Sequence, residues 1–166
     1  MPDIKSLAHP PSPAEDEVRQ AIELLFFAYR DFTAEPDAIL ARYNFGRAHH
    51  RVIHFVGRHP RMTVGELLGI LRITKQSLNR VLGQLVRQGF VIRCPGARDR
   101  RQRLLELTIK GRELERQLSE PQRARVAGAC RQAGTQAVEG FRAVLLGIIA
   151  DEDDRRRFES MSSKKR

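Results

Sequence analysis

Apolar residues recur every three or four positions over much of this chain, which is the spacing of one face of an α-helix. The clearest stripe lies between residues 74 and 88, and its members are Leu78, Val81, Leu82, Leu85 and Val86. The opposite face carries polar or small residues, namely Lys75, Gln76, Asn79, Arg80 and Gly83. Because no bulky apolar residue obstructs this second face, it can present amides to base edges and cations to phosphates.

A shorter helix is predicted directly before this stretch. Thr63 and Glu66 form a Thr-x-x-Glu capping box. The apolar face that follows consists of Val64, Leu67, Leu68 and Leu71. Arg72-Ile73 then forms a short connection, and the hydroxyl of Thr74 can cap the second helix. Two helices joined in this way are typical of a helix-turn-helix in which the second helix contacts DNA.

Two short strand-like runs follow, at residues 90–92 and 104–107, and Gly89 supplies a C-cap before the first. Pro95-Gly96 supplies turn chemistry between the runs. The connecting segment holds a single acid, Asp99, among five arginines: Arg93, Arg98, Arg100, Arg101 and Arg103. A hairpin with so basic a tip is suited to approach a polyanion.

The overall charge agrees with such a partner. The 166 residues include 30 Lys and Arg against 20 Asp and Glu, a net charge of +10, which favours nucleic acid or an anionic membrane. No apolar run approaches the roughly 20 residues needed to span a bilayer, and the N-terminus lacks the apolar segment of a signal peptide. We therefore expect no membrane partner and, with only two cysteines, a cytoplasmic setting.

Helices are predicted on both sides of this region. Residues 1–11 are interpreted as a flexible N-terminal arm, followed by a helix from about Pro13 that is more apolar than one small core requires. The additional apolar residues suggest a second buried surface, supplied by another subunit. Pro36 should begin another helix that runs to about Gly57.

After the second strand, Thr108 should cap a long helix, which Pro121 should kink or interrupt. A last apolar helix should begin near Thr135, and residues 161–166 are interpreted as a basic tail.

Three motifs in this order resemble the winged helix-turn-helix of MarR-type bacterial transcription regulators. They are Thr74-Lys75-Gln76-Ser77-Leu78-Asn79-Arg80, Asp99-Arg100-Arg101 and Leu107-Thr108-Ile109-Lys110-Gly111. The resemblance covers roughly residues 36–158. It implies a mainly α fold with a small β-hairpin wing, built as a winged helix-turn-helix plus a helical dimerisation bundle.

The resemblance also implies a division of the chain and a function. Residues 12–35 would form an N-terminal dimerisation helix, residues 36–107 the winged DNA-binding region, and residues 108–160 the C-terminal dimerisation helices. The expected protein is a homodimer that binds a pseudo-palindrome in double-stranded DNA, with recognition helices about one turn apart. Repression is the family's commoner mode, and the resemblance also implies that a small-molecule effector regulates it.

Specific residues are expected to contact DNA. Gln76, Asn79 and Arg80 are candidates for base reading, because amides can pair with adenine and arginine with guanine. Candidates for phosphate contact at the helix N-terminus are Thr74, Lys75 and Ser77.

In the wing, the resemblance implies that Arg101 enters the minor groove and that Asp99 orients it through a charge-assisted hydrogen bond. Arg98 and Arg100 would then clamp phosphates.

The resemblance implies an effector pocket beside the helix predicted from Pro36 to about Gly57, with Tyr43, His50 and His54 as candidate lining residues. His50 and His54 are four residues apart, a geometry that a metal or haem iron could use. No cysteine or carboxylate accompanies them at ligand spacing, so ordinary surface or pocket-lining histidines are the favoured interpretation. We expect no cofactor and no metal site.

Other interpretations stay open. The polar helix face and the basic hairpin could simply be solvated surfaces. Cys94, beside Arg93, could act in a redox switch, whereas Cys130 is interpreted as packed. The first helix has no cysteine, unlike the peroxide-sensing branch of the family.

The alternative function is that of an architectural protein that binds DNA or RNA without sequence choice. An enzyme is not expected, because no nucleophile elbow, Gly-rich phosphate loop, His-Glu-x-x-His or Cys-x-x-Cys motif is found. The acidic run at residues 152–154 is interpreted as a solvated loop or helix end.

Overall fold

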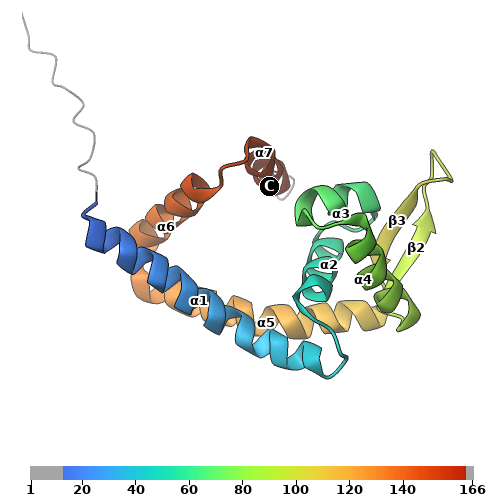
Figure 1. Cartoon of the computed structure of the whole chain (residues 1–166), viewed down its shortest axis with the longest axis horizontal. Coiled ribbons are helices and arrows are strands. Elements are labelled where there is room, and N and C mark those ends of the chain that lie inside the picture. Colours follow the sequence, from blue (N-terminus) through green and yellow to red (C-terminus); the bar gives the residue numbers. More distant parts are fainter. Residues whose placement is uncertain (1–12, 164–166) are drawn as a thin grey trace, which may run out of the picture. The chain divides into compact units, whose positions relative to one another are not determined.

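The computed structural model describes residues 13–163, and this part of the chain is mainly α-helical with one small antiparallel sheet (Figure 1). The elements are α1 (Glu15–Ala41), α2 (Arg47–Arg58), β1 (Met62–Thr63), α3 (Val64–Leu71), α4 (Lys75–Arg87), β2 (Val91–Pro95), β3 (Arg103–Leu107), α5 (Ile109–Ala133), α6 (Thr135–Ile148) and α7 (Glu152–Ser163). The predicted fold class is confirmed. The predicted arm at residues 1–11 and the last residues of the predicted tail, 164–166, lie outside the described residues.

The chain divides into two compact units, residues 1–34 and residues 35–166. In the described part of the first unit, α1 carries seven large apolar side chains that are exposed in the single chain: Val18, Ile22, Leu24, Leu25, Phe26, Phe27 and Tyr29. The second unit contains the rest of α1 and all the other elements.

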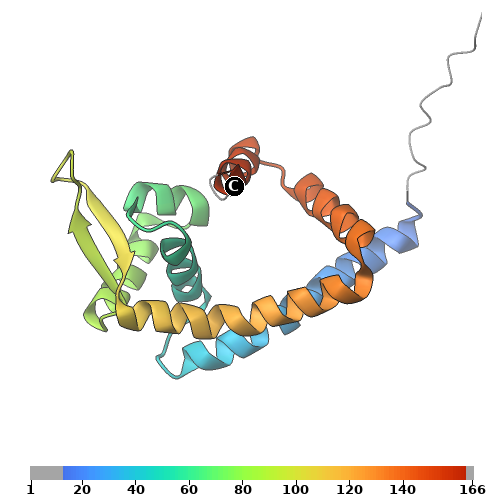
Figure 2. The same cartoon turned by 180° about the vertical axis from the view of Figure 1, so that it is seen from behind.

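The sheet has the strand order β1-β3-β2. β2 and β3 form the predicted hairpin, with Val91 opposite Leu107 and Pro95 opposite Arg103. β1 was not predicted from the sequence, because its two residues become a strand only by pairing with β3. Figure 2 shows β3 continuing almost directly into α5.

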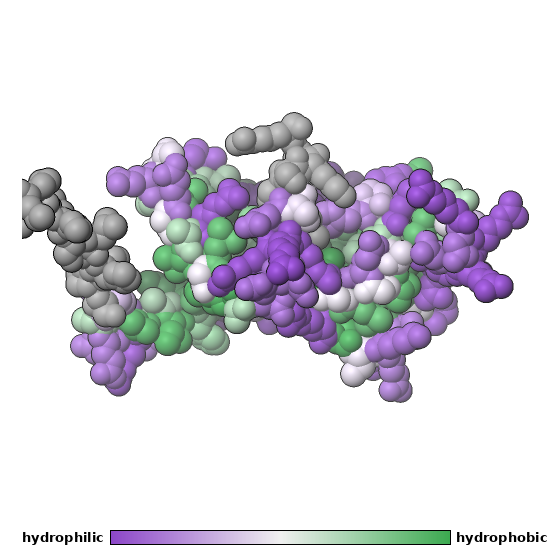
Figure 3. Space-filling view, turned by 90° about the horizontal axis from the view of Figure 1, so that it is seen from above, coloured by the Kyte–Doolittle hydropathy of each residue, from purple (hydrophilic) through white to green (hydrophobic). Residues whose placement is uncertain are grey.

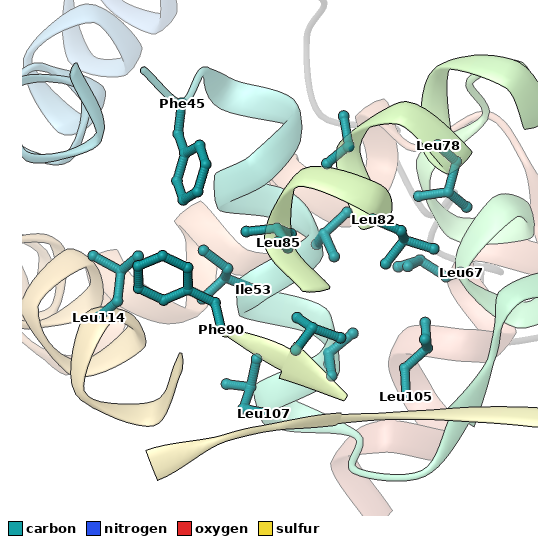
Figure 4. Packing of buried hydrophobic residues seen from close by; sticks show 14 of the residues in the cluster. Phe45, Ile53, Leu67, Leu78, Leu82, Leu85, Phe90, Leu105, Leu107 and Leu114 are labelled. Atoms are coloured by element: carbon teal, nitrogen blue, oxygen red, sulfur yellow. The ribbon is translucent and has the colours of Figure 1, made fainter. Parts of the chain in front are cut away.

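The core of the second unit lies between α2, α4, the sheet and the start of α5 (Figure 4). The stripe predicted on α4 supplies Leu78, Val81, Leu82 and Leu85, all at most 3% exposed. Val86, which was assigned to the same stripe, is 36% exposed, so that prediction was wrong. The other large, fully buried members of the core include Ile53, Leu67, Phe90, Leu105, Leu114 and Leu118.

Three threonine caps predicted from the sequence are present. The Thr63 hydroxyl accepts from the Glu66 amide, and the Glu66 carboxylate accepts from the Thr63 amide, which completes the capping box. Thr74 and Thr108 cap α4 and α5 through their hydroxyl oxygens, which accept from the amides of Ser77 and Gly111. Together these caps fix where α3, α4 and α5 begin.

The helices before the winged region differ from the prediction. α1 runs through Pro36 to Ala41, and α2 begins only at Arg47. Pro36 is buried, and its burial offsets the backbone hydrogen bond that a proline cannot make. The break falls instead where Asn44 adopts a φ of +55°, a conformation that asparagine tolerates better than most residues.

The C-terminal part agrees with the prediction only in part. Pro121 lies within α5, which continues through it from Ile109 to Ala133, so the proline does not interrupt the helix, and α6 begins at Thr135 as predicted. The acidic run at residues 152–154 is the first turn of a further helix, α7. Carboxylates are favourable at the N-terminal end of a helix, which explains why this run begins one.

Candidate nucleic-acid interface

α4 presents its polar face to solvent because the buried side chains on its other face, Leu78, Val81, Leu82 and Leu85, hold that face against the core. Lys75, Gln76, Asn79 and Arg80 are all exposed. Their backbone is held by the buried residues one turn away, so these side chains project from a rigid support. The exposed set can therefore meet a partner without any change in the core.

Thr74 and Ser77 form two hydrogen bonds with each other at the start of α4. The Ser77 amide donates to Thr74 Oγ1 at 3.1 Å, and the Thr74 hydroxyl donates to Ser77 Oγ at 2.9 Å. Both residues were predicted to contact phosphate. The cap already uses the Ser77 amide, so a phosphate at this position would meet the side chain of Lys75 and the hydroxyl groups instead.

The wing tip is ordered by Asp99, but not in the predicted way. The Asp99 carboxylate accepts from the backbone amide of Arg101 at 2.9 Å, rather than from its guanidinium. Arg103 also donates to the backbone carbonyl of Arg100 at 2.9 Å. These contacts shape the loop and leave the guanidinium groups of Arg98, Arg100 and Arg101 exposed. Figure 3 shows hydrophilic residues covering the end of the molecule where the wing lies.

A cavity of about 410 Å³ lies between α3, α4 and the base of the wing. Its lining includes Lys75 and Asn79 from α4 and three residues that were not among the DNA contacts named from the sequence: Arg93, Gln102 and Arg103. Arg93 and Arg103 share a face of the hairpin, because each lies opposite a residue two positions from the other. Knowing which residues pair across the hairpin would have placed Arg93 and Arg103 on one face. The pairing could not be predicted, because the sequence does not define the length of the connecting loop.

His49 joins α2 to α4 and was also missed from the sequence. Its ring stacks on Phe45, with ring centroids 4.5 Å apart, and its Nδ1 accepts from the Gly46 amide. The other nitrogen, Nε2, lies 2.6 Å from the side-chain oxygen of Gln84. The neutral ring with its proton on Nε2 satisfies both contacts. Burial lowers the pKa of His49, and nearby Arg80 lowers it further.

The three predicted pocket residues have different surroundings. The Tyr43 ring packs against the rings of Phe45 and Phe90, at centroid distances of 5.7 and 5.3 Å. His50 and His54 are half-buried on α2, and burial lowers the pKa of both. Tyr43 thus extends the aromatic part of the core, while the two histidines retain partial exposure.

Several other features bear on the open interpretations. Cys94 and Cys130 are both free and half-buried. Among residues 13–163, no group of three or more His, Cys, Asp or Glu side chains is arranged to hold a metal ion. No helix in that range is both long enough and apolar enough to cross a membrane.

Comparison with known proteins identifies the family. The MarR family model matches residues 43–102. PetP, an HTH-type transcriptional regulator of Rhodobacter capsulatus, is 52% identical over 147 residues, which covers 89% of this chain and 88% of PetP.

Two solved structures share the fold. Streptococcus pneumoniae FabT, solved in complex with DNA, has a TM-score of 0.70 at 20% identity, covering 85% of this chain and 99% of FabT. NadR, solved in complex with 4-hydroxyphenylacetate, has a TM-score of 0.63 at 20% identity, covering 86% of this chain and 97% of NadR. The geometry of the helix-turn-helix and its wing, together with these likenesses, shows that the chain belongs to the MarR family of transcription regulators.

Proposed function

We propose that this protein is a homodimeric, sequence-specific repressor that binds a pseudo-palindromic operator in double-stranded DNA. The observation that carries the proposal is the exposed polar face of α4 beside an exposed basic wing. A helix supported in this way fits the major groove, and a basic hairpin beside it can reach the flanking backbone or minor groove. FabT, which shares the fold, was solved bound to DNA.

Within this proposal, Gln76, Asn79 and Arg80 read base edges. The phosphate backbone of the DNA is contacted by Thr74, Lys75, Ser77, Arg98 and Arg100, and Arg101 enters the minor groove. We add Arg93 and Arg103 to the backbone contacts, because both line the cavity next to Lys75. A phosphate lying there would face three cations, which favours affinity without dictating sequence.

Dimerisation is supported by apolar surface that a single chain leaves exposed. The residues concerned are the seven large apolar side chains of α1 and, on α6, Phe141, Val144, Leu145 and Ile148. So much exposed apolar surface on two helices is typical of an interface. We therefore assign residues 12–35 and 108–160 to dimerisation and residues 36–107 to DNA binding.

We further propose that a small molecule regulates binding, as the ligand found in NadR suggests. His50 and His54 are the candidate contacts on α2, with Tyr43 at the edge of the aromatic cluster. An effector would act by fitting one arrangement of the dimer better than another, and only to the extent of that difference in affinity. A regulator of bacterial transcription would work in the cytoplasm, where the DNA is.

Selection of bound duplexes from a random DNA pool tests the proposal, read together with the mass of the protein in solution. The expected result is an inverted repeat with half-sites about ten base pairs apart, bound by a dimer. Recovery of no motif, with affinity that simply collapses as salt rises, would favour the architectural alternative.

A further inference from the structure

The C-terminal helix contacts the helix-turn-helix itself. Figures 1 and 2 both show α7 beside α3, within the second unit. Arg72 forms the centre of the contact: its Nη2 lies 2.7 Å from Asp151 Oδ2 and 3.2 Å from Asp154 Oδ2. One guanidinium of the helix-turn-helix is thus held by two carboxylates from a helix beyond it.

Both partners are fixed by their own local structure. Arg72 is the C-cap of α3 in the left-handed conformation, with a φ of +51°, and it precedes the α4 cap Thr74 by two residues. Asp151 uses its other carboxylate oxygen, Oδ1, to accept from the amides of Asp153 and Asp154, which starts α7. The carboxylate therefore caps α7 and holds Arg72 at the same time.

A second contact aligns α7 with α3. The guanidinium of Arg157 lies against Gly69, where an added Cβ would come within 2.6 Å of its Nη2. Arg157 Nη1 also lies 3.5 Å from the carbonyl oxygen of Glu66. Because Gly69 has no side chain, Arg157 can lie directly on α3, and α7 is held at two places.

The ion pairs of Arg72 are exposed enough for another anion to replace the two carboxylates. The side chain of Arg72 is 55% exposed, and those of Asp151 and Asp154 are 39% and 35% exposed. Ion pairs with this exposure contribute little to stability, so a phosphate could replace the carboxylates at small cost. Glu152 and Asp153, in the same turn, pair with Arg156 instead of Arg72.

We propose that Arg72 is a DNA phosphate contact whose guanidinium is occupied by Asp151 and Asp154 in the free protein, so that α7 limits the affinity for DNA. The inference rests on the proposed function, because it assumes that the start of α4 meets the DNA backbone. The turn that carries Arg72 leads into that start, and the carboxylates at the beginning of α7 bring negative charge to it. DNA and α7 compete for one cation.

The test compares two pairs of substitutions on the full chain. Asp151→Asn with Asp154→Asn removes the two charges that hold Arg72 and keeps a capping side chain at position 151. Glu152→Gln with Asp153→Asn removes two charges from the same turn and leaves in place the two carboxylates that pair with Arg72. Affinities are measured for the selected duplex and a shuffled duplex, after circular dichroism shows that each variant is folded.

The affinity of Asp151→Asn with Asp154→Asn should rise roughly threefold to fivefold, for both duplexes. The affinity of Glu152→Gln with Asp153→Asn should rise less. Arg72→Ala in the background of the first pair abolishes the gain and lowers the salt slope by about one unit. Gly69→Ala, which alters no charge but displaces Arg157, should raise the affinity in the same direction.

Equal gains from the two pairs, or a gain that persists after Arg72→Ala, would overturn the inference in favour of a general charge effect. A loss of affinity in the first pair would show that α7 supports DNA binding instead. Failure of the proposed function looks different: the wild-type protein would then bind selected and shuffled duplexes equally well.

Discussion

At the scale of single residues, the exposed side chains of the interface separate into those that meet phosphates and those that reach bases. A phosphate contact releases counterions and has no sequence preference, whereas a base contact changes discrimination more than it changes salt dependence. Lys75 lines the cavity beside Arg93 and Arg103, which makes it the clearest phosphate candidate on α4.

Lys75→Ala should weaken binding to selected and shuffled duplexes by a similar factor and lower the salt slope by about one unit. Titrations of both duplexes at several salt concentrations measure this. Arg123→Ala, which removes an exposed cation from the middle of α5, serves as the control and should leave the slope unchanged. A loss confined to the selected duplex would instead assign Lys75 to base reading.

His49 makes the stability of the α2–α4 contact depend on pH. Its pKa is lower in the folded protein than its ordinary value of about 6.5, so the unfolded chain binds the proton more readily. The free energy of unfolding should therefore fall as the pH drops below about 6.5. Protonation also removes the Nδ1 lone pair that accepts from Gly46.

Denaturant unfolding at a series of pH values tests this. His49→Gln should have a lower free energy of unfolding at neutral pH than the wild-type protein. On acidification, this free energy should fall less steeply in the variant than in the wild-type protein. His50 and His54 have their pKa lowered in the same direction, so part of the pH dependence should persist. An unchanged pH dependence in His49→Gln would contradict the assigned role.

At the scale of elements, the wing and α5 are joined by close packing at Gly111. A Cβ at this position would lie 2.0 Å from the carbonyl oxygen of Phe90, so no side chain fits without moving the backbone. This contact gives a physical reason for the glycine in the motif that begins α5. It also brings the backbone just before β2 against the start of α5.

Gly111→Ala should accordingly destabilise the protein by about 1–3 kcal/mol, as overpacking usually does. Gly128→Ala is a matched control in the same helix, because an added Cβ there meets nothing closer than 3.9 Å. It should be neutral or stabilising by up to about 1 kcal/mol, since alanine favours helix. Thermal or denaturant unfolding should show a clear loss of stability for Gly111→Ala and none for Gly128→Ala; equal effects would show that the close approach is unimportant.

Features that depend on residues close together in the sequence could be predicted, and features that depend on distant residues could not. The caps at Thr63, Thr74 and Thr108 and the buried stripe of α4 depend on residues within a few positions, and they were predicted correctly. β1 depends on pairing with a strand some forty residues away, and the contact of Arg72 with Asp151 joins still more distant segments. Neither leaves a local pattern. The extension of α1 past Pro36 was missed because the burial of a proline is a tertiary effect.

At the scale of the whole molecule, the proposed dimer explains the apolar side chains left exposed in a single chain. On α6 these include Phe141 at 53% and Val144 at 61% exposed. A carboxylate placed among them would be costly to bury in an interface and harmless on a monomer surface.

Val144→Asp should therefore reduce the mass in solution from that of a dimer to that of one 19.0 kDa chain, and weaken binding to a two-fold operator. Light scattering coupled to size exclusion measures the mass. Ile92→Asp is the control, because Ile92 is 44% exposed on β2, in the region assigned to DNA binding and outside the proposed interface. Equal masses for the wild-type protein and Val144→Asp would contradict the assignment of α6.

Asn79→Ala is the sharpest test of whether the polar face of α4 reads the base sequence. The measurement is the ratio of affinities for the selected duplex and the same duplex altered at one base pair of each half-site. If Asn79 reads a base, the substitution should lower this ratio at one position, by roughly 1–3 kcal/mol of discrimination, while affinity for shuffled DNA barely changes. An equal loss of affinity for selected and shuffled DNA, with the ratio unchanged, would contradict it.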